Sequence, residues 1–329
     1  MIMAFKEKVP GISISVITGL AALFLSEHYN APAMLFALLL GIAMSFTYEE
    51  TKCKEGIDFT SSTVLRVGVA LLGLRIALSD LLSLGWQTIA LLALAIFTTI
   101  VVGIVLAKLL GLKKNFGALT GGSVAICGAS AAMAITAILP EYKNKERDTL
   151  LTVIGVTSLS TIAMVVYPIL ASYLGFDDVQ SGLFLGGTIH DVAQVVGAGY
   201  TISESTGDLS TLVKLVRVSM LMPVVMVMLF FIKRASQSSV VDAKATRIPF
   251  FLIMFVLLML VNSFIDIPEV VTQVSTDFSR FALVIAIAAI GMKSNLSKLM
   301  SVGIRPILLM LLETIWIALF IIMIINLHI

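Results

Sequence analysis

Charged residues are scarce in this 329-residue sequence, where they make up 13% of the chain against 59% for apolar residues. Soluble domains carry about 25% charged residues, so this chain has too few to cover a globule in water. We therefore expect lipid to cover much of the folded protein, which excludes a soluble domain. The net charge is only +2 and no stripe of basic residues is present, so nucleic acid is not an expected partner.

Cysteine is rare as well. The two cysteines, Cys53 and Cys127, form no CxxC pair, which excludes a disulfide framework and a cysteine zinc site. The motifs of metalloproteases, P-loop proteins and GxSxG hydrolases are absent. The sequence shows neither a cofactor signature nor a nucleophile–base pair. It therefore predicts a protein that is not an enzyme and that has no cofactor.

Long apolar runs are what the chain does contain. Eleven stretches come close to the ~20 residues that an α-helix needs to cross a bilayer. A β-barrel would show alternating segments of about ten residues instead. We predict an all-α polytopic membrane protein with a single integral membrane transporter domain over residues 1–329. The stretches are Pro10–Glu27, Pro32–Tyr48, Phe59–Leu78, Trp86–Leu110, Phe116–Leu139, Thr149–Leu174, Ser181–Tyr200, Leu209–Ile232, Pro249–Phe264, Phe278–Met292 and Ile304–Leu327.

Two of these stretches, residues 116–139 and 181–200, are interrupted by several glycines. Such interruptions are typical of discontinuous or re-entrant helices, whose exposed backbone must line a cavity. The distribution of Lys and Arg over the loops favours nine crossings plus these two segments, with eleven crossings as the alternative. Lys6 and Lys8 predict a cytoplasmic N-terminus.

A short internal repeat links two regions of the chain. Gly73–Gly85 reads GLRIALSDLLSLG and Gly291–Gly303 reads GMKSNLSKLMSVG, with six of thirteen positions identical. Each copy closes one apolar stretch and opens the next, and the two copies are expected to point in opposite directions. Inverted repeats with paired broken segments are the pattern of secondary transporters.

The second glycine-rich segment carries the densest group of polar side chains. His190 and Gln194 are spaced i, i+4 on a helix, and Gln194 can also reach Asp191. Histidine titrates near neutral pH, so these three residues form a candidate proton relay or cation-coupling group. Alternatively, Thr188 caps a helix and Asp191 completes a capping box, which leaves His190 and Gln194 unexplained.

The first glycine-rich segment places Ser123, Cys127 and Ser130 at i, i+4 and i+7. On one helix this is a narrow polar stripe, which suits either tight helix packing or an anion site at a half-helix start.

Ionisable residues inside other apolar stretches need a partner or a wet cavity. Arg66 could grip an oxyanion with two parallel donors or pair with Asp191 or Glu313. Lys214 and Arg217 share a helix face, either as a basic helix start or as positive groups facing the site. Glu313 suits coupling or structural pairing equally.

Two segments, ICGASA at Ile126–Ala131 and TIHDVAQVVGAG at Thr188–Gly199, together resemble a sulfate exporter family of bacterial inner-membrane proteins. Leu65–Leu78 and Lys214–Val225 are similar to that family as well. The family is grouped with the cation–proton antiporter and anion transporter superfamily. The resemblance therefore implies inverted repeats, crossing broken helices and elevator-like movement. The two broken segments here are closer in sequence than is usual in the superfamily, which leaves room for a permuted second repeat.

Together these features predict a secondary transporter that exports a small anion such as sulfate, sulfite or a sulfonate, coupled to H+ or Na+. The alternative is a cation–proton antiporter in which Asp191 binds the ion. The expected partners are the anion and the lipids of the bacterial inner membrane, and a homodimer is left open. The expected substrate-binding residues are Arg66, Ser123, Cys127, Gly128, Ser130, Gly187, Thr188 and Arg217; the expected coupling residues are His190, Asp191 and Gln194; no metal site is expected.

Overall fold

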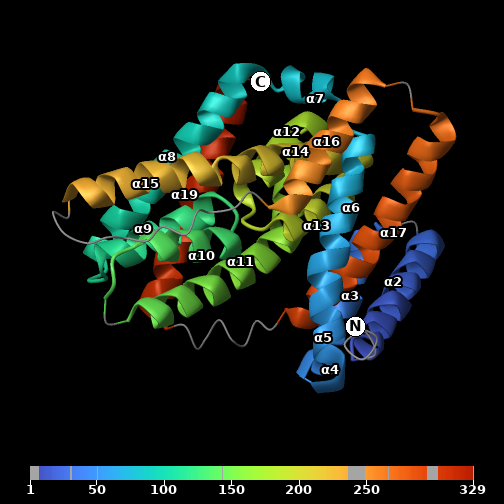
Figure 1. The fold of residues 1–329 in the computed structure, drawn as a ribbon, viewed down its shortest axis with the longest axis horizontal. Helices are drawn as coiled ribbons and strands as arrows, with labels where there is room; N and C mark the ends of the chain where they lie inside the picture. Colours follow the sequence, from blue (N-terminus) through green and yellow to red (C-terminus); the bar gives the residue numbers. More distant parts are fainter. Residues whose placement is uncertain are drawn as a thin grey trace. The chain divides into compact units, whose positions relative to one another are not determined.

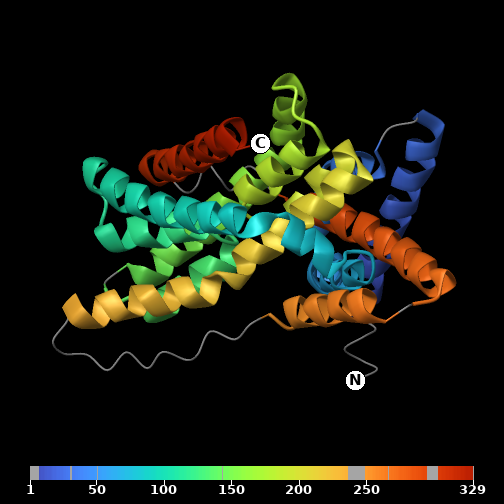
Figure 2. The same cartoon turned by 90° about the horizontal axis from the view of Figure 1, so that it is seen from above.

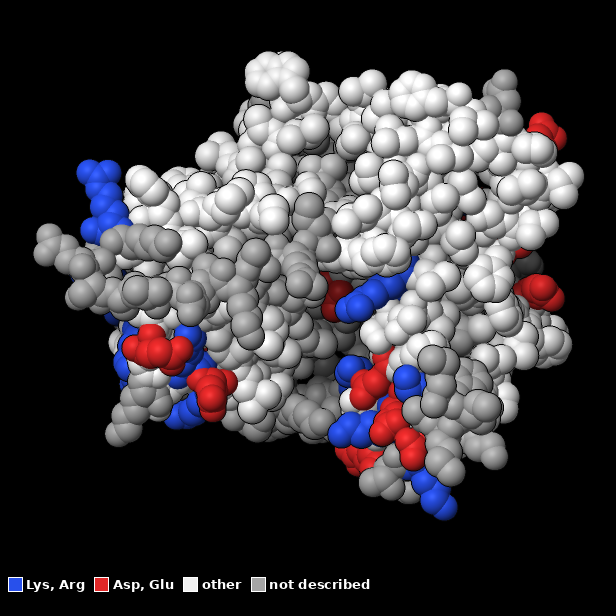
Figure 3. Space-filling view, viewed as in Figure 1, with Lys and Arg blue, Asp and Glu red and all other residues white. Residues whose placement is uncertain are grey.

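The computed structural model describes residues 7–29, 32–49, 51–142, 144–235, 249–265, 267–294 and 303–328. Helices fill most of these ranges, and no strand occurs within them. The face seen in Figure 3 is mostly uncharged, and its Lys, Arg, Asp and Glu side chains gather in separate groups. Seven helical stretches in the described part of the chain are long and apolar enough to cross a membrane: Val9–Tyr29, Lys52–Leu74, Gly85–Leu109, Lys145–Tyr173, Glu204–Ile232, Glu269–Lys293 and Ile304–Leu327.

The prediction of an all-α polytopic membrane protein is therefore confirmed. The number of crossings stays a prediction, because four further apolar helices are shorter than a span. Lys6, on which the orientation of the N-terminus partly rests, lies outside the described residues.

The chain divides into two compact units, each assembled from separate stretches of sequence. Unit 1 comprises Met1–Gly85, Val196–Asp208 and Pro249–Asn295. Figures 1 and 2 show its early blue helices beside its late orange ones. The helices are α2 (Val9–Tyr29), α3 (Ala33–Ala43), α4 (Phe46–Glu49), α5 (Thr51–Phe59), the π-turn η1 (Thr60–Val64), α6 (Leu65–Leu71), the 3₁₀ turn η2 (Leu72–Leu74), α7 (Leu78–Ser83), α16 (Phe250–Phe264) and α17 (Glu269–Lys293).

Within unit 1, the helices that lead into the two copies of the repeat run antiparallel. Lys293 at the end of α17 forms an ion pair with Asp58 on α5, at 2.6 Å. Ser279, earlier on α17, donates a hydrogen bond to the Gly68 carbonyl on α6, at 2.7 Å. Residue numbers therefore rise along α17 in the direction in which they fall along α5 and α6, so the helices are antiparallel, as an inverted repeat requires.

Both copies end on a glycine in the left-handed region, with φ of 72° at Gly85 and 92° at Gly303. Residues with a side chain rarely adopt this backbone conformation, so both glycines suit the sharp turn into the next long helix. The repeat positions Leu296, Ser297, Leu299 and Ser301 lie outside the described residues.

Unit 2 comprises Trp86–Val195, Leu209–Ile248 and Leu296–Ile329, and it contains both glycine-rich segments. Close glycine contacts join its first helices. A Cβ built on Gly117 would lie 2.4 Å from the Gly103 carbonyl oxygen, so only glycine allows this approach. The helices are α8 (Gly85–Leu109), α9 (Lys114–Ala125), α10 (Ala129–Ile138), α11 (Lys145–Tyr173), α12 (Asp178–Thr188), α15 (Leu221–Ala235) and α19 (Ile304–His328), and the unit boundary falls inside α13 (Val192–Ile202) and α14 (Glu204–Ser219).

The first glycine-rich segment is a helical hairpin. The chain leaves α9 at Ala125, breaks at residues 126–128 and continues as α10. A Cβ built on Gly122 would lie 2.3 Å from the Ile135 side chain. In a straight continuation, residues thirteen positions apart would lie about 20 Å apart. Because these two touch, α10 must fold back along α9.

The second glycine-rich segment also reverses direction. On α12, Gly182 packs against Leu209 of α14 and Gly186 against Val213. The contacts advance together, so α12 and this part of α14 run parallel. Because Leu209 lies beside Gly182, the chain that leaves α12 at Thr188 must turn back before it reaches α14. Two segments that double back agree with the prediction of discontinuous or re-entrant helices.

Candidate functional site

The two helix breaks lie next to each other inside unit 2. The first contains Gly128, whose φ of 62° and ψ of −122° belong to a backbone region open only to glycine. The second comprises residues 189–191. A Cβ built on Gly128 would lie 3.8 Å from the Cβ of His190. Segments more than sixty positions apart in sequence therefore meet at their interruptions.

Two cations from α14 join the breaks. The Lys214 Nζ donates to the Ile126 carbonyl at 2.6 Å and to the Ile189 carbonyl at 2.8 Å. Lys214 is 0% exposed and Arg217 is 1% exposed. One ammonium group thus bonds both interruptions of the helical backbone at once.

Arg217 binds the same helix ends with all three of its guanidinium nitrogens. The Nε donates to Ala125 at 3.0 Å, and Nη1 donates to Gly186 at 3.0 Å and to Ile189 at 3.3 Å. The Nη2 donates to Val124 at 3.2 Å and also to Ala125. The guanidinium N–H groups of Arg217 are therefore directed to backbone carbonyls rather than into an open cavity.

These hydrogen bonds pair carbonyl groups that the end of a helix leaves without partners. The last carbonyls of α9 and α12 have no partner within their own helices and carry the negative end of the helix dipole. Lys214 and Arg217 supply both hydrogen bonds and positive charge to those ends. The sequence predicted that the two residues share a helix face but not that they hold the breaks, and a direct contact of Arg217 with substrate stays a prediction.

The predicted coupling residues lie at the second break and the start of α13. His190 is fully buried, and its Nε2 lies 3.0 Å from the Thr314 hydroxyl of α19. Its Nδ1 and the Oε1 of Gln194 are buried, and neither has a hydrogen-bond partner among the described residues. Buried polar atoms are normally satisfied. These two polar atoms can therefore still accept a further partner.

Asp191 acts as the cap of α13. Its backbone N–H donates to the Ser160 hydroxyl of α11 at 3.2 Å, and its Oδ1 accepts from the Ala193 N–H at 3.4 Å. A carboxylate at this position is favourable for the positive end of the helix dipole. Asp191 thus occupies the capping position that the alternative gave to Thr188, instead of completing a capping box from within the helix.

The Thr188 part of that alternative is wrong. Thr188 is the last residue of α12, and its hydroxyl donates backwards to the Phe184 carbonyl at 2.5 Å. The helix does not begin after Gly187. That glycine lies inside α12, where a Cβ would come within 3.1 Å of Ile321. The predicted contact between Gln194 and His190 requires both residues to lie on the same helix. In the structure, His190 precedes α13 and bonds to Thr314 instead.

The predicted polar stripe of the first segment is not continuous either, because the break separates its members. Ser123 is on α9, where its hydroxyl donates to the Leu119 carbonyl at 2.5 Å. Cys127 is buried within the break, and Ser130 is exposed near the start of α10. The stripe assumed a single helix, and the roles of these residues in substrate binding stay predictions.

The remaining candidates, Arg66 and Glu313, form none of the hydrogen bonds described above. Arg66 belongs to α6 in unit 1, where its side chain is exposed and takes part in no ion pair among the described residues. Glu313 is fully buried on α19 and bonds to Thr120. The role predicted for Arg66 in anion binding stays a prediction.

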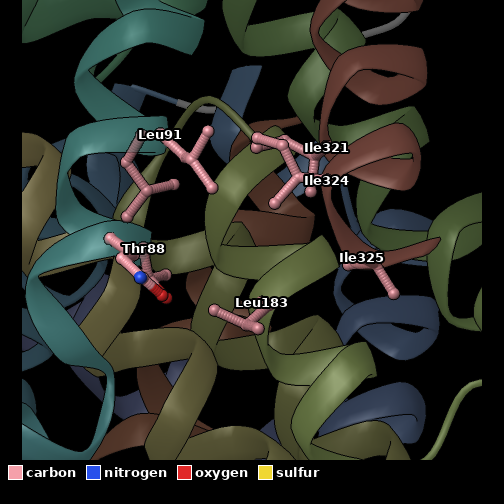
Figure 4. A pocket seen from close by; sticks show the side chains of 8 residues that line it. Thr88, Leu91, Leu183, Ile321, Ile324 and Ile325 are labelled. Atoms are coloured by element: carbon pink, nitrogen blue, oxygen red, sulfur yellow. The ribbon is translucent and has the colours of Figure 1, made fainter. Parts of the chain in front are cut away.

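A pocket elsewhere in unit 2 is distinct from the breaks. Figure 4 shows its lining, which is mostly Leu and Ile side chains from α8, α12 and α19, including Leu91, Leu183 and Ile321. None of its lining residues belongs to either break. Its apolar lining offers an anion no charged partner, so the breaks remain the candidate site.

Comparison with known proteins adds a family. The chain matches the family described as conserved hypothetical protein 698 over residues 10–310. It is 49% identical to a UPF0324 membrane protein of Chlorobaculum tepidum over 315 residues, covering 95% of this chain and 88% of the relative. It is 50% identical to the UPF0324 membrane protein TauZ of Paracoccus pantotrophus over 318 residues, covering 96% and 94% of the two chains. No solved structure matches the chain.

Proposed function

We propose a transport function for this chain, which belongs to the UPF0324 membrane protein family, described as conserved hypothetical protein 698. The protein is a secondary active transporter of a small anion, such as sulfate, sulfite or a sulfonate. It acts in the bacterial inner membrane with its N-terminus in the cytoplasm, exports its substrate and couples the movement to H+ or Na+. It is not an enzyme.

The observation that carries this proposal is the pair of buried cations at two facing helix breaks. Lys214 and Arg217 together carry a formal charge of +2. Each helix end contributes roughly half a charge, so the ends of α9 and α12 together contribute about −1. The starts of α10 and α13 contribute about +1, and Asp191 carries −1 when ionised. The sum is about +1, which favours an anion as the missing component.

The anion would lie at the starts of the returning helices rather than at the ends held by Arg217. Backbone N–H groups at a helix start point outward and attract anions. Gly128 starts α10 without a side chain that would block the approach. Ser130 adds an exposed hydroxyl nearby. Half-helices that point their starts at an anionic substrate are a recurring design of secondary transporters.

Coupling is assigned to Asp191, with His190 and Gln194 beside it. Protonation or cation binding at Asp191 changes the charge of the site by one unit, and therefore changes its affinity for the anion. The buried Nδ1 of His190 and Oε1 of Gln194, which have no hydrogen-bond partner among the described residues, are available to an ion or water. The division of the chain into two compact units supports an elevator-type movement, in which the unit holding both breaks carries the substrate.

The test is uptake of labelled sulfate and sulfite into proteoliposomes under an imposed pH or Na+ gradient. Asp191→Asn should abolish gradient-driven flux while the protein stays folded, because Asn caps helices as well as Asp does. Asp178→Asn, the same change at the exposed start of α12, should transport normally.

Full activity of Asp191→Asn would contradict the coupling role. Wild-type protein that moves no anion under either gradient, and exchanges cations for protons, would instead establish an antiporter with Asp191 as its ion site.

A further inference from the structure

Glu313 lies in a niche of unit 2 that Gly103 makes possible. Its side chain is 0% exposed. A Cβ built on Gly103 of α8 would lie 2.4 Å from its Oε1, 2.7 Å from the Gly117 carbonyl and 3.0 Å from the Gly121 Cα. Any larger residue at position 103 would therefore occupy the place of the carboxyl group. The absence of a side chain on Gly103 therefore leaves the space that the carboxyl group of Glu313 fills.

The hydrogen bonds of Thr120 indicate which form of the carboxyl group fits. The Thr120 Oγ1 lies 2.7 Å from the Glu313 Oε1, 3.1 Å from the Phe116 carbonyl and 3.3 Å from the Gly117 carbonyl. A hydroxyl has one hydrogen to donate. If Glu313 is neutral, its O–H donates to Thr120 and Thr120 donates to Phe116, so both bonds form. If Glu313 is ionised, Thr120 can donate to only one of them.

No opposite charge faces this carboxyl group within the part of the chain that the structure describes. The helices α9, α11 and α12 pack against α19, and α8 approaches it at Gly103. Their Lys, Arg, Asp and Glu side chains are confined to terminal turns: Lys108 on α8, Lys114 on α9, Lys145, Glu146, Arg147 and Asp148 on α11, and Asp178 on α12. Glu313 takes part in no ion pair among the described residues, and its Oε2 has no partner. A buried carboxylate without a cation is costly, so the neutral acid suits the niche.

The niche is also connected to the second break. Glu313 bonds to α9 of the first hairpin through Thr120, and the next residue, Thr314, lies 3.0 Å from the His190 Nε2. Adjacent residues of one rigid helix therefore contact one broken segment each. A change in the protonation of Glu313 would alter the packing of α19 against the first hairpin and would reach His190 through Thr314.

We propose that Glu313 binds a coupling proton of this transporter, as a second coupling residue in addition to Asp191. The acid is neutral while packed in the glycine niche, and it releases its proton to water when transport opens the niche on the other side of the membrane. This proposal rests on the transport function above and names the coupling ion as H+. In this proposal the anion binds at the helix breaks, and α19 links anion binding to proton binding at Glu313.

Infrared spectroscopy of the purified protein in lipid tests the proton site without any substrate. The carbonyl stretch of a buried neutral carboxylic acid should appear in the wild type and disappear in Glu313→Gln. Glu146→Gln, the same change at an exposed position of α11, should leave it unchanged. An identical acid band in wild type and Glu313→Gln would overturn the proposal. Gel filtration confirms that both variants are folded.

Proteoliposomes test the coupling. Glu313→Gln resembles the neutral acid in shape, so it should still exchange labelled for unlabelled sulfate or sulfite across the membrane. Its flux should no longer rise when a pH gradient is imposed, whereas the wild type and Glu146→Gln should respond. Full gradient stimulation of Glu313→Gln would overturn the proposal. Absence of any anion flux in the wild type would refute the transport function instead, and the infrared result would still decide whether Glu313 holds a proton.

Discussion

The two helix breaks of unit 2 both reverse the direction of the chain, but different residues make the two turns. The first turns on Gly128, whose positive φ no other residue adopts comfortably, and its titratable side chain is Cys127. The second contains no glycine. It turns at residues 189–191, where Asp191 caps the returning helix and His190 bonds to α19.

The first break thus depends on backbone conformation, and the second depends on side chains that can form hydrogen bonds. At the first break, the backbone conformation of Gly128 makes the turn, and the N–H groups at the start of α10 have no side-chain cap. At the second, the carboxyl group of Asp191 accepts a backbone hydrogen bond of the returning helix and can change its charge. Lys214 and Arg217 serve both breaks equally, because each contacts carbonyls from both helix ends.

Arg217→Met should have the largest effect, since it removes a feature common to both breaks. Four carbonyls, at Val124, Ala125, Gly186 and Ile189, would lose a charged donor. Each unsatisfied buried group costs about 1–3 kcal/mol, so we expect a loss of at least ~3 kcal/mol. Thermal unfolding in detergent measures it. Arg305→Met, at an exposed position, is the control, and an unchanged melting temperature for Arg217→Met would show that the breaks hold without it.

The existence of the breaks was predictable from sequence, but their positions were not. Glycine counts correctly marked residues 116–139 and 181–200, and the structure has helix pairs over Lys114–Ile138 and Asp178–Ile202. The glycine pairs themselves, however, lie inside α9 and α12, where they allow close helix packing. Glycine marks both turns and tight contacts, and sequence alone does not distinguish these uses.

The partners of the polar residues were predicted less well for a related reason. The spacing of His190 and Gln194 suggested a shared helix face, but the interruption places His190 outside α13 and against Thr314. Such long-range contacts depend on tertiary packing that no local spacing reveals. Buried cations gave a usable signal: Lys214 and Arg217 stand three positions apart in an apolar stretch, where charge needs a partner. The family resemblance was confirmed at the level of a membrane protein family.

Gly128→Ala tests the first break, with an intermediate effect. A φ of 62° with ψ of −122° lies outside the regions open to alanine, and such strain costs about 1–3 kcal/mol. Transport should fall as well, because relief of the strain would move the start of α10. Gly175→Ala is the matched control: its φ is 71°, and nothing lies within 4 Å of a Cβ built there. If the two variants show equal flux, the geometry of the first break is not needed for transport.

Thr188→Val should have the smallest effect, and its comparison with Asp191→Ala tests how the second break is built. The Thr188 hydroxyl bonds only to Phe184 in its own helix among the recorded hydrogen bonds, and such bonds add little to helix stability. Asp191→Ala removes the cap of α13 and should cost about 0.5–2 kcal/mol. Thermal unfolding should therefore rank Asp191→Ala below Thr188→Val, with Thr188→Val close to wild type. The reverse order would mean that Thr188 caps the returning helix, which would move the second break back to its glycine pair and make the two breaks alike.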